Sequence, residues 1–168
     1  MNSSPSPRIV VREVEPEEYE AAGELVVQSY ITAGILSDDR GYDRILRDVS
    51  GRANSAAVLV AVDGVDVVGT GTVALAGSEH AEIAHGSEAE FRYFGVRPDM
   101  WGHGIGHQLV EEAENIAGRL GATDIVMSVI AHNSPALAMY EQHGFRRIPE
   151  RDWYPAPDIA LLVLHKQL

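Results

Sequence analysis

Residues 90–106 read EFRYFGVRPDMWGHGIG, and this stretch decides how the rest of the chain is interpreted. Its apolar first part, Phe91–Val96, predicts a strand. Its second part has glycine at alternate positions, Gly102, Gly104 and Gly106, and a helical pattern follows at once. Glycine lets a ligand approach the backbone closely, because no Cβ stands in the way. The free N–H groups and the dipole at the start of the helix then favour a phosphate or pyrophosphate.

A helix, a strand and a second helix are predicted after the glycines. The first helix ends at Gly121, which suits a left-handed C-cap. Asp124–Ile130 is short, apolar and rich in β-branched residues, which predicts a buried strand. In the second helix, Ser134 is expected to be the N-cap, Pro135 fits the first helical position, and Gly144 suits the C-cap. The apolar face of the first helix comprises Ile105, Leu109, Val110, Ala113, Ile116, Ala117 and Leu120.

The glycine loop has three competing interpretations. A dinucleotide fingerprint counted from Gly104 would need a third glycine at the position of Leu109. A P-loop would need Gly-Lys-Ser/Thr at the start of the helix, and this loop contains no lysine. The glycines could also form a strand-to-helix turn that binds nothing. The sequence downstream favours a site for a phosphorylated cofactor over a turn that binds nothing.

Taken together, these segments resemble the GNAT superfamily of acyl-CoA-dependent N-acyltransferases. Gly104 and Gly106 match the family's (Gln/Arg)-x-x-Gly-x-(Gly/Ala) element, although Trp101 stands where the family usually has Gln or Arg. The strand before the loop is similar to the family's fourth strand, with Glu90 near its start. The Asn-x-x-Ala-x-x-x-Tyr-x-x-x-Gly-Phe element is matched by Asn133, Ala136, Tyr140, Gly144 and Phe145. The resemblance implies acetyl-CoA as the co-substrate.

The other segments alternate between strand and helix patterns in the order of that family. We expect an α/β (α+β) fold with a mixed central sheet of about seven strands flanked by about four helices. Asp63-Gly64 is expected to be a hairpin turn, and the polar segment Ala76–Ser87 and the turn-rich Asp152–Asp158 are expected to be loops. The further strands are predicted at Arg8–Val14, Ala56–Val62, Val65–Ala74, Phe145–Ile148 and Ile159–Leu164, and the further helices at Pro16–Tyr30 and Gly41–Val49.

The composition is that of one domain without disulfides. With 168 residues the chain can bury a core, and we expect a single domain at residues 8–168 after a flexible tail at residues 1–7. It has no cysteine, which excludes disulfides and a thiol nucleophile. No apolar run approaches the roughly 20 residues of a membrane span, and no signal-peptide core is present, so a cytoplasmic location is expected. The net charge of −12 disfavours nucleic acid and membrane as partners and favours a cationic acceptor, although acidic residues also simply solvate surfaces.

Two side chains are candidates for the chemistry of acyl transfer. The resemblance implies that Tyr140 protonates the leaving thiolate, and a phenol with a pKa of about 10 is protonated at neutral pH; its alternative role is aromatic packing. Glu90 is the candidate general base, because a carboxylate at the start of a buried strand is partly desolvated. Glu88, an ion pair between Glu90 and Arg92, or water as the proton acceptor are the alternatives.

The remaining expected site residues bind the cofactor. The resemblance implies that the backbone at Phe94 and Val96 holds the thioester carbonyl, and that Asn133 binds the amide arm unless it only stabilises a turn. His103 and His107 lie one helical turn apart, but no third ligand is nearby and no metal is expected. The full expected set is Phe94, Val96, Gly102, His103, Gly104, Ile105, Gly106, His107 and Asn133.

The sequence thus predicts an acetyl-CoA-dependent N-acetyltransferase. It would act by direct attack of a primary amine of a small molecule or peptide in a ternary complex, as a monomer or homodimer. The helices around Ser29–Val49, the loop Ala76–Ser87 and the stretch Trp153-Tyr154-Pro155 are expected to wall the acceptor pocket. The alternatives are a non-catalytic CoA-binding sensor or regulatory module, and a protein that binds another nucleotide.

Overall fold

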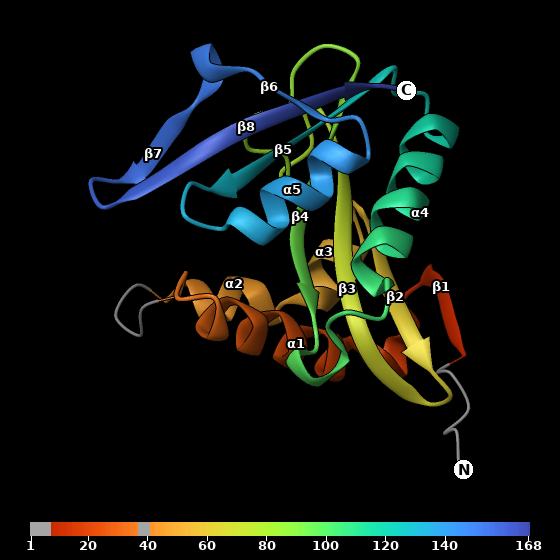
Figure 1. Cartoon of the computed structure of the whole chain (residues 1–168). Coiled ribbons are helices and arrows are strands. Elements are labelled where there is room, and N and C mark those ends of the chain that lie inside the picture. The colour runs from red at the N-terminus through yellow and green to blue at the C-terminus, as the bar shows by residue number, and fades with distance from the viewer. Residues whose placement is uncertain (1–7, 37–40) are drawn as a thin grey trace.

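The computed structural model describes residues 8–36 and 41–168, so the expected tail at residues 1–7 lies outside the described residues. One mixed sheet runs through the molecule in the order β1-β2-β3-β4-β5-β8-β6, and β7 also pairs with β8 (Figure 1). The strands are β1 Ile9–Glu13, β2 Ala57–Asp63, β3 Asp66–Leu75, β4 Glu88–Val96, β5 Asp124–Ile130, β6 Arg146–Arg147, β7 Trp153–Ala156 and β8 Ile159–Gln167. The α-helices are α1 Tyr19–Thr32, α2 Tyr42–Arg47, α3 Val49–Ala53, α4 Ile105–Arg119 and α5 Ser134–Gln142.

Helices cover both faces of the sheet, and the alternation of side chains in β2 shows why. Val58, Val60 and Val62 pack with residues of α1 and α3, whereas Leu59 and Ala61 belong to the core beneath α4. Since successive side chains of a strand point to opposite faces, a continuous apolar strand must be covered on both. The expected mixed sheet with flanking helices is confirmed.

The sheet has eight strands in the described residues rather than the expected seven. Trp153–Ala156 lies within the segment that was expected to be a turn-rich loop, but it pairs antiparallel with the start of β8, Trp153 opposite Leu161 and Ala156 opposite Ile159. Pro155 is tolerated there because β7 pairs only with β8, and a strand with a free edge does not need every N–H. A hairpin that contains proline therefore formed where the local pattern indicated turns.

The described residues form five α-helices rather than four, because the expected helix Gly41–Val49 is interrupted at Asp48. The backbone of Asp48 leaves the helical region (φ −78°, ψ 62°), and its side chain accepts a hydrogen bond from Gly51 N–H at 3.0 Å. It thereby ends α2 and caps α3. The apolar spacing continues through this break, so the pattern alone predicted one helix.

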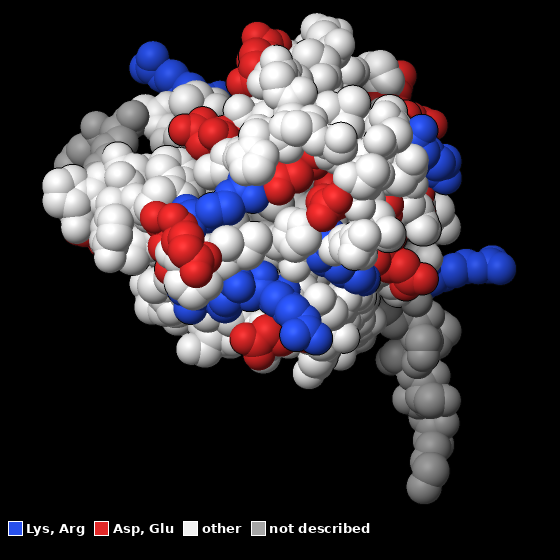
Figure 2. Space-filling view, turned by 90° about the horizontal axis from the view of Figure 1, so that it is seen from above, with Lys and Arg blue, Asp and Glu red and all other residues white. Residues whose placement is uncertain are grey.

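Charged side chains of both signs lie close together on the surface. On the face seen in Figure 2, over the end of the molecule that carries β6 and β7, basic side chains lie beside acidic ones.

None of the helices in the described ranges is both long enough and apolar enough to span a bilayer.

Arg52 joins three elements inside the molecule. It is only 1% exposed, and it donates to the carbonyls of Ile45 at 2.6 Å and Leu46 at 2.9 Å, which lie near the end of α2. Its guanidinium carbon lies 4.4 Å from the centre of the Tyr93 ring of β4. The Ile45 carbonyl also accepts the N–H of Asp48 at 3.3 Å, so the donor that Arg52 gives to the Leu46 carbonyl is the one that the end of α2 most depends on.

Replacing Arg52 by Met should lower the free energy of unfolding by about 2–4 kcal/mol, because the buried Leu46 carbonyl loses its donor and the Ile45 carbonyl loses its shorter hydrogen bond. Urea unfolding monitored by circular dichroism measures the loss. Arg47→Met is the matched control, since Arg47 forms ion pairs with Glu24 and Asp43 at the surface and its loss should barely move the midpoint. Equal midpoints for the two variants would contradict the role given to Arg52.

Candidate active site

The sheet opens between β4 and β5. These two parallel strands are paired only from Glu88–Glu90 to Asp124–Val126, and they then diverge (Figure 1). On its other side β5 remains paired with β8 along its whole length, from Asp124 to Ile130. The edge of β4 that faces β5 therefore has no strand partner beyond Glu90. Its backbone N–H and C=O groups are available to a ligand that enters the opening.

A β-bulge lies in the part of β4 that is paired with β3 but not with β5. Thr70 of β3 is opposite Gly95 and Thr72 is opposite Arg92, so two residues of β4, Tyr93 and Phe94, face a single residue of β3. Tyr93 has φ 53°, and among the described residues it is the one non-glycine residue with a positive φ. Bulges re-aim the backbone, and strain of this kind is often found at functional sites. The bulge includes Phe94, an expected cofactor contact, and Val96 follows two residues later.

The glycine loop leads from the end of β4 into α4, as expected. Gly102 and Gly104 have φ of 84° and 76°, and a Cβ at either would meet nothing within 4 Å, so both face open space. The first hydrogen bond of α4 runs from Gln108 N–H to Gly104 C=O, which leaves the N–H groups of residues 105–107 without helical acceptors. No side chain caps this end, and no acidic residue lies in the first turn. The arrangement fits an anion such as pyrophosphate.

Gly106 is required for a different reason. A Cβ at this position would lie 3.0 Å from Met139 Sδ of α5 and 3.3 Å from Phe94 Cζ of β4. Its absence lets α4 pack closely on both elements. Trp101, at the start of the loop, is 54% exposed, and its indole N–H donates to Val96 C=O at 2.9 Å.

Tyr140 lies on α5, where this helix packs against the bulge. Its side chain is 4% exposed, and its ring centre lies 6.2 Å from that of Phe94 and 6.0 Å from that of Phe145. Burial raises the pKa of Tyr140 above that of a free phenol, so the hydroxyl is protonated throughout the physiological range. A buried phenol beside the opening has the protonation state of a general acid.

The N-cap of α5 is Asn133 rather than Ser134. Asn133 Oδ1 accepts the N–H of Ala136 at 3.3 Å, and the helix begins at Ser134 with Pro135 in its second position. The helix therefore starts one residue earlier than expected, and Asn133 takes the capping position that was assigned to Ser134. The cap uses the side-chain oxygen of Asn133, and the side-chain NH₂ group takes no part in it.

Glu90 is inside β4, only 1% exposed, and it is strongly engaged. Its Oε1 accepts hydrogen bonds from the backbone N–H groups of Glu82, Ile83 and Ala84 at 2.8, 2.7 and 3.0 Å. Its Oε2 lies 3.5 Å from Nε of Arg92. The ion pair that was an alternative role for Glu90 is thus present.

The histidines of the loop face other partners. His103 Nδ1 lies 3.1 Å from Met100 C=O, and His107 Nδ1 lies 2.8 Å from Nε2 of His143 at the end of α5. Burial, followed by the nearby His107, lowers the pKa of His143. Within residues 8–36 and 41–168, no group of three or more His, Cys, Asp or Glu side chains could hold a metal ion.

Two aromatic side chains that the sequence did not single out individually, Tyr30 and Tyr42, pack against the cluster that contains Tyr93 of β4. Tyr30 of α1 and Tyr42 of α2 have ring centres 6.4 Å apart, and burial raises the pKa of both hydroxyls, while the Arg92 guanidinium acts in the opposite direction. Trp153 of β7 is fixed by a 3.0 Å hydrogen bond from its indole N–H to Ser128 Oγ of β5. These residues belong to the segments expected to wall the acceptor pocket. Residues 37–40 of that wall lie outside the described part, and no local signal distinguished the two tyrosines from core residues.

Comparison with known proteins gives a family and several short matches. A model of the Acetyltransferase (GNAT) family matches residues 20–145. Over 59 residues the chain is 37% identical to YwnH of Bacillus subtilis, which carries a provisional name as a phosphinothricin acetyltransferase; the match covers 35% of this chain and 33% of YwnH. Over 69 residues it is 32% identical to the mycothiol acetyltransferase of Catenulispora acidiphila, covering 41% of this chain and 22% of that protein. The matches thus span a third or less of these curated relatives.

Solved structures share the whole fold. A GNAT-family acetyltransferase from Staphylococcus aureus Mu50 superposes with a TM-score of 0.77 at 17% identity, covering 96% of this chain and 99% of that one. The PaiA N-acetyltransferase of Thermoplasma acidophilum, solved in complex with coenzyme A, gives 0.71 at 20% identity, with 96% and 99% covered. YncA of Salmonella typhimurium, solved with acetyl-CoA, gives 0.72 at 19% identity, with 95% and 94% covered.

Gly104→Val should weaken acetyl-CoA binding about tenfold or more, because a β-branched residue is strained at φ 76° and the loop must change shape. Isothermal titration calorimetry measures the dissociation constant. Gly121→Val is the matched control, because Gly121 has φ 92°, faces open space and lies at the other end of α4. Both variants should lose stability, but only Gly104→Val should lose affinity; unchanged affinity in a folded Gly104→Val would contradict the loop assignment.

Proposed function

The chain belongs to the GNAT acetyltransferase family, and we propose from this premise that it transfers an acetyl group from acetyl-CoA to a primary amine of a small molecule or peptide. The observation that carries the proposal is the opening between β4 and β5, which has the glycine loop at one end and the buried Tyr140 beside it. The proposed enzyme is the single domain formed by residues 8–168.

The residues of this chain fit the cofactor at both of its ends. The N–H groups of residues 102–107 supply donors for the pyrophosphate, with no competing side-chain cap. The unpaired edge of β4 around Phe94 and Val96 supplies backbone groups to the arm and to the carbonyl of the acyl group. Bound acetyl-CoA supplies the reactive thioester.

Tyr140 is the proposed general acid. The amine nitrogen forms the new bond to the acetyl carbon, the carbon–sulfur bond breaks, and the phenol gives its proton to the departing sulfur. Burial raises the pKa of Tyr140, so this proton is present at every pH at which the protein is assayed. Oε1 of Glu90 already accepts three N–H groups, and we therefore place water rather than Glu90 as the acceptor of the amine's proton.

A panel of amines tests the proposal. Phosphinothricin, spermidine, L-lysine and glucosamine would each be incubated with acetyl-CoA, and released CoA would be measured with a thiol reagent. The chain contains no cysteine, so the protein adds no background. At least one amine should accelerate CoA release. Tight binding of acetyl-CoA without release for any amine would favour the sensor module, and thermal stabilisation by ATP or NAD in place of CoA would favour a nucleotide-binding protein.

Tyr140→Phe should reduce kcat about 10²-fold or more with little change in acetyl-CoA affinity, because the ring keeps its contacts and only the proton donor is lost. The loss should be smaller for a thioester whose thiol has a lower pKa, since that thiolate needs less protonation. Steady-state kinetics with both thioesters measures this. Tyr19→Phe removes a hydroxyl from the first turn of α1 and should behave as wild type. Equal losses for both thioesters would assign Tyr140 to packing alone.

A further inference from the structure

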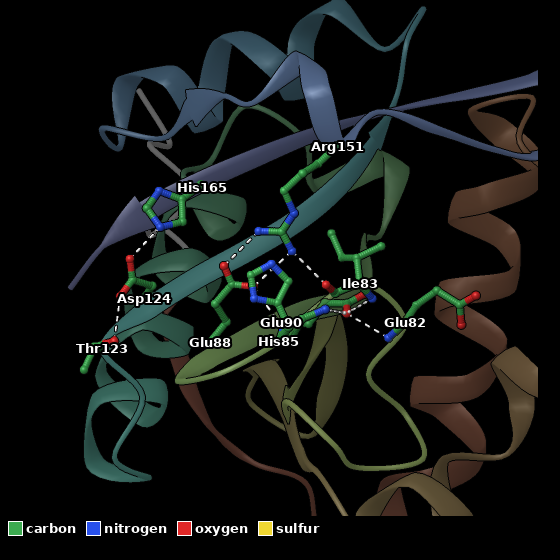
Figure 3. Close-up of polar contacts among 10 residues, drawn as sticks. Glu82, Ile83, His85, Glu88, Glu90, Thr123, Asp124, Arg151 and His165 are labelled. Atoms are coloured by element: carbon green, nitrogen blue, oxygen red, sulfur yellow. Dashed lines mark hydrogen bonds and ion pairs between the residues drawn. The ribbon is translucent and has the colours of Figure 1, made fainter.

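The loop between β3 and β4, residues 76–87, is held by side chains from two different parts of the fold (Figure 3). We call it the β3–β4 loop. Glu90 binds it from within β4 through three backbone N–H groups, those of residues 82–84. Arg92, two residues further along the same face, donates to the carbonyl of His80. The middle of the loop, residues 80–84, is therefore fixed by side chains of β4.

Arg151 holds the same loop from the part of the sheet that contains β5 and β8. It lies in the short segment between β6 and β7, and it donates to the Ile83 carbonyl at 2.7 Å and to both carboxylate oxygens of Glu88 at 2.8 and 3.0 Å. Glu88 in turn accepts the N–H of His85 at 3.0 Å. Burial, the largest single effect, acts to raise the pKa of Glu88, but the hydrogen bonds from Arg151 and from the His85 N–H and the charge of Arg151 together outweigh it, and the pKa is lowered. Arg151 thus connects the β5–β8 part of the sheet to β4 and its loop.

Both carboxylate oxygens of Glu90 already have partners, Oε1 the three N–H groups and Oε2 the guanidinium of Arg92. A general base takes up a proton in every turnover, and protonation of Glu90 would weaken its hold on the three N–H groups and on Arg92. Glu90 is isolated from solvent and lies near the charges of Glu88, Arg92 and Arg151. These surroundings suit a side chain that fixes the loop better than one that exchanges protons with a substrate.

The β3–β4 loop lies near α2, one of the segments expected to wall the acceptor pocket, and at the opposite end of β4 from the glycine loop. Arg92 and Glu82 both influence the titration of Tyr42, so the loop, β4 and α2 share one electrostatic environment. Val96 lies six residues beyond Glu90, a separation of up to about 20 Å in an extended strand, and the glycine loop begins only after that end. A change at Glu90 or Arg151 should therefore affect the acceptor far more than the phosphates of the cofactor.

We propose that Glu90 and Arg151 are positioning residues that hold the β3–β4 loop as a fixed wall of the acceptor pocket. The loop then restricts which amine reaches the thioester. The assignment of the wall to an acceptor rests on the proposed acetyl transfer, whereas the anchoring of the loop does not.

The test compares Glu90→Gln, which removes the charge at nearly constant shape, with Arg151→Met, which removes the second anchor. Hydrogen exchange without ligands should show faster exchange at residues 76–87 in both variants. The KM for the amine of the panel that reacts fastest with wild type should rise about tenfold, with the KM for acetyl-CoA changed by less than about twofold and the shape of the pH–rate profile retained. Arg151→Lys should restore part of the effect, since lysine keeps the charge but not the two-pronged geometry.

Arg147→Met is the matched control. Arg147 lies on β6, near Arg151 in sequence, and its ion pair is with Asp152 rather than with the loop, so this variant should leave exchange and both KM values at wild-type level. Glu90→Asp, which keeps the charge with a shorter reach, replaces Glu90→Gln if the latter does not fold.

Two results would overturn the proposal. Unchanged exchange at residues 76–87 in both variants would mean that neither residue anchors the loop. A lower kcat and an altered pH profile in Glu90→Gln alone, with Arg151→Met like wild type, would make Glu90 the general base. If no amine reacts even with wild type, the acceptor assignment is lost together with the proposed function, while the exchange result still decides whether the loop is anchored; the two failures are thus distinguishable.

Discussion

The structure depends on the short parallel contact between β4 and β5. Only Glu88–Glu90 pair with Asp124–Val126, and the strands then separate while β5 continues alongside β8. Unpaired backbone within a sheet is costly unless a ligand or water satisfies it. The separation also gives the bulge at Tyr93 and Phe94 room to form. The opening therefore leaves one edge of β4 without a strand partner, and it is the proposed binding site.

Helices α4 and α5 contribute the chemical groups of the proposed site. Gly106 lets α4 approach Met139 and Phe94 closely, and Tyr140 reaches the same bulge from α5. The free N–H groups at the start of α4 and the phenol of Tyr140 are thereby fixed relative to one strand edge. Donors that are already oriented need no rearrangement when charge develops, which is the usual source of their catalytic effect.

Charged side chains are used inside the molecule mainly to fix backbone. Arg52 supplies the carbonyls at the end of α2, Glu90 gathers three N–H groups of the β3–β4 loop, and Arg151 fastens the Ile83 carbonyl and Glu88 together. Each of these groups is largely withdrawn from water, where hydrogen bonds to ions are strong and their loss is costly. An excess of acidic residues in the composition thus says little about catalysis, since two of the most buried carboxylates serve the fold.

The sequence by itself determined the elements whose signals are local. The alternate glycines, the apolar face from Ile105 to Ala117, the hairpin turn at Gly64 and the caps at Gly121 and Gly144 all depend on neighbours within a few residues, and the structure has each of them. Two details differ: the two-residue loop of the hairpin is Gly64-Val65 rather than Asp63-Gly64, and Leu120, expected at the end of the apolar face, is 48% exposed. Only the tertiary structure decided the pairing of β7, the separation of β4 from β5 and the partners of Glu90. The bond from Arg151 to the Ile83 carbonyl joins residues 68 positions apart. No periodicity encodes such a contact, because it exists only after the sheet has brought both segments to the same edge.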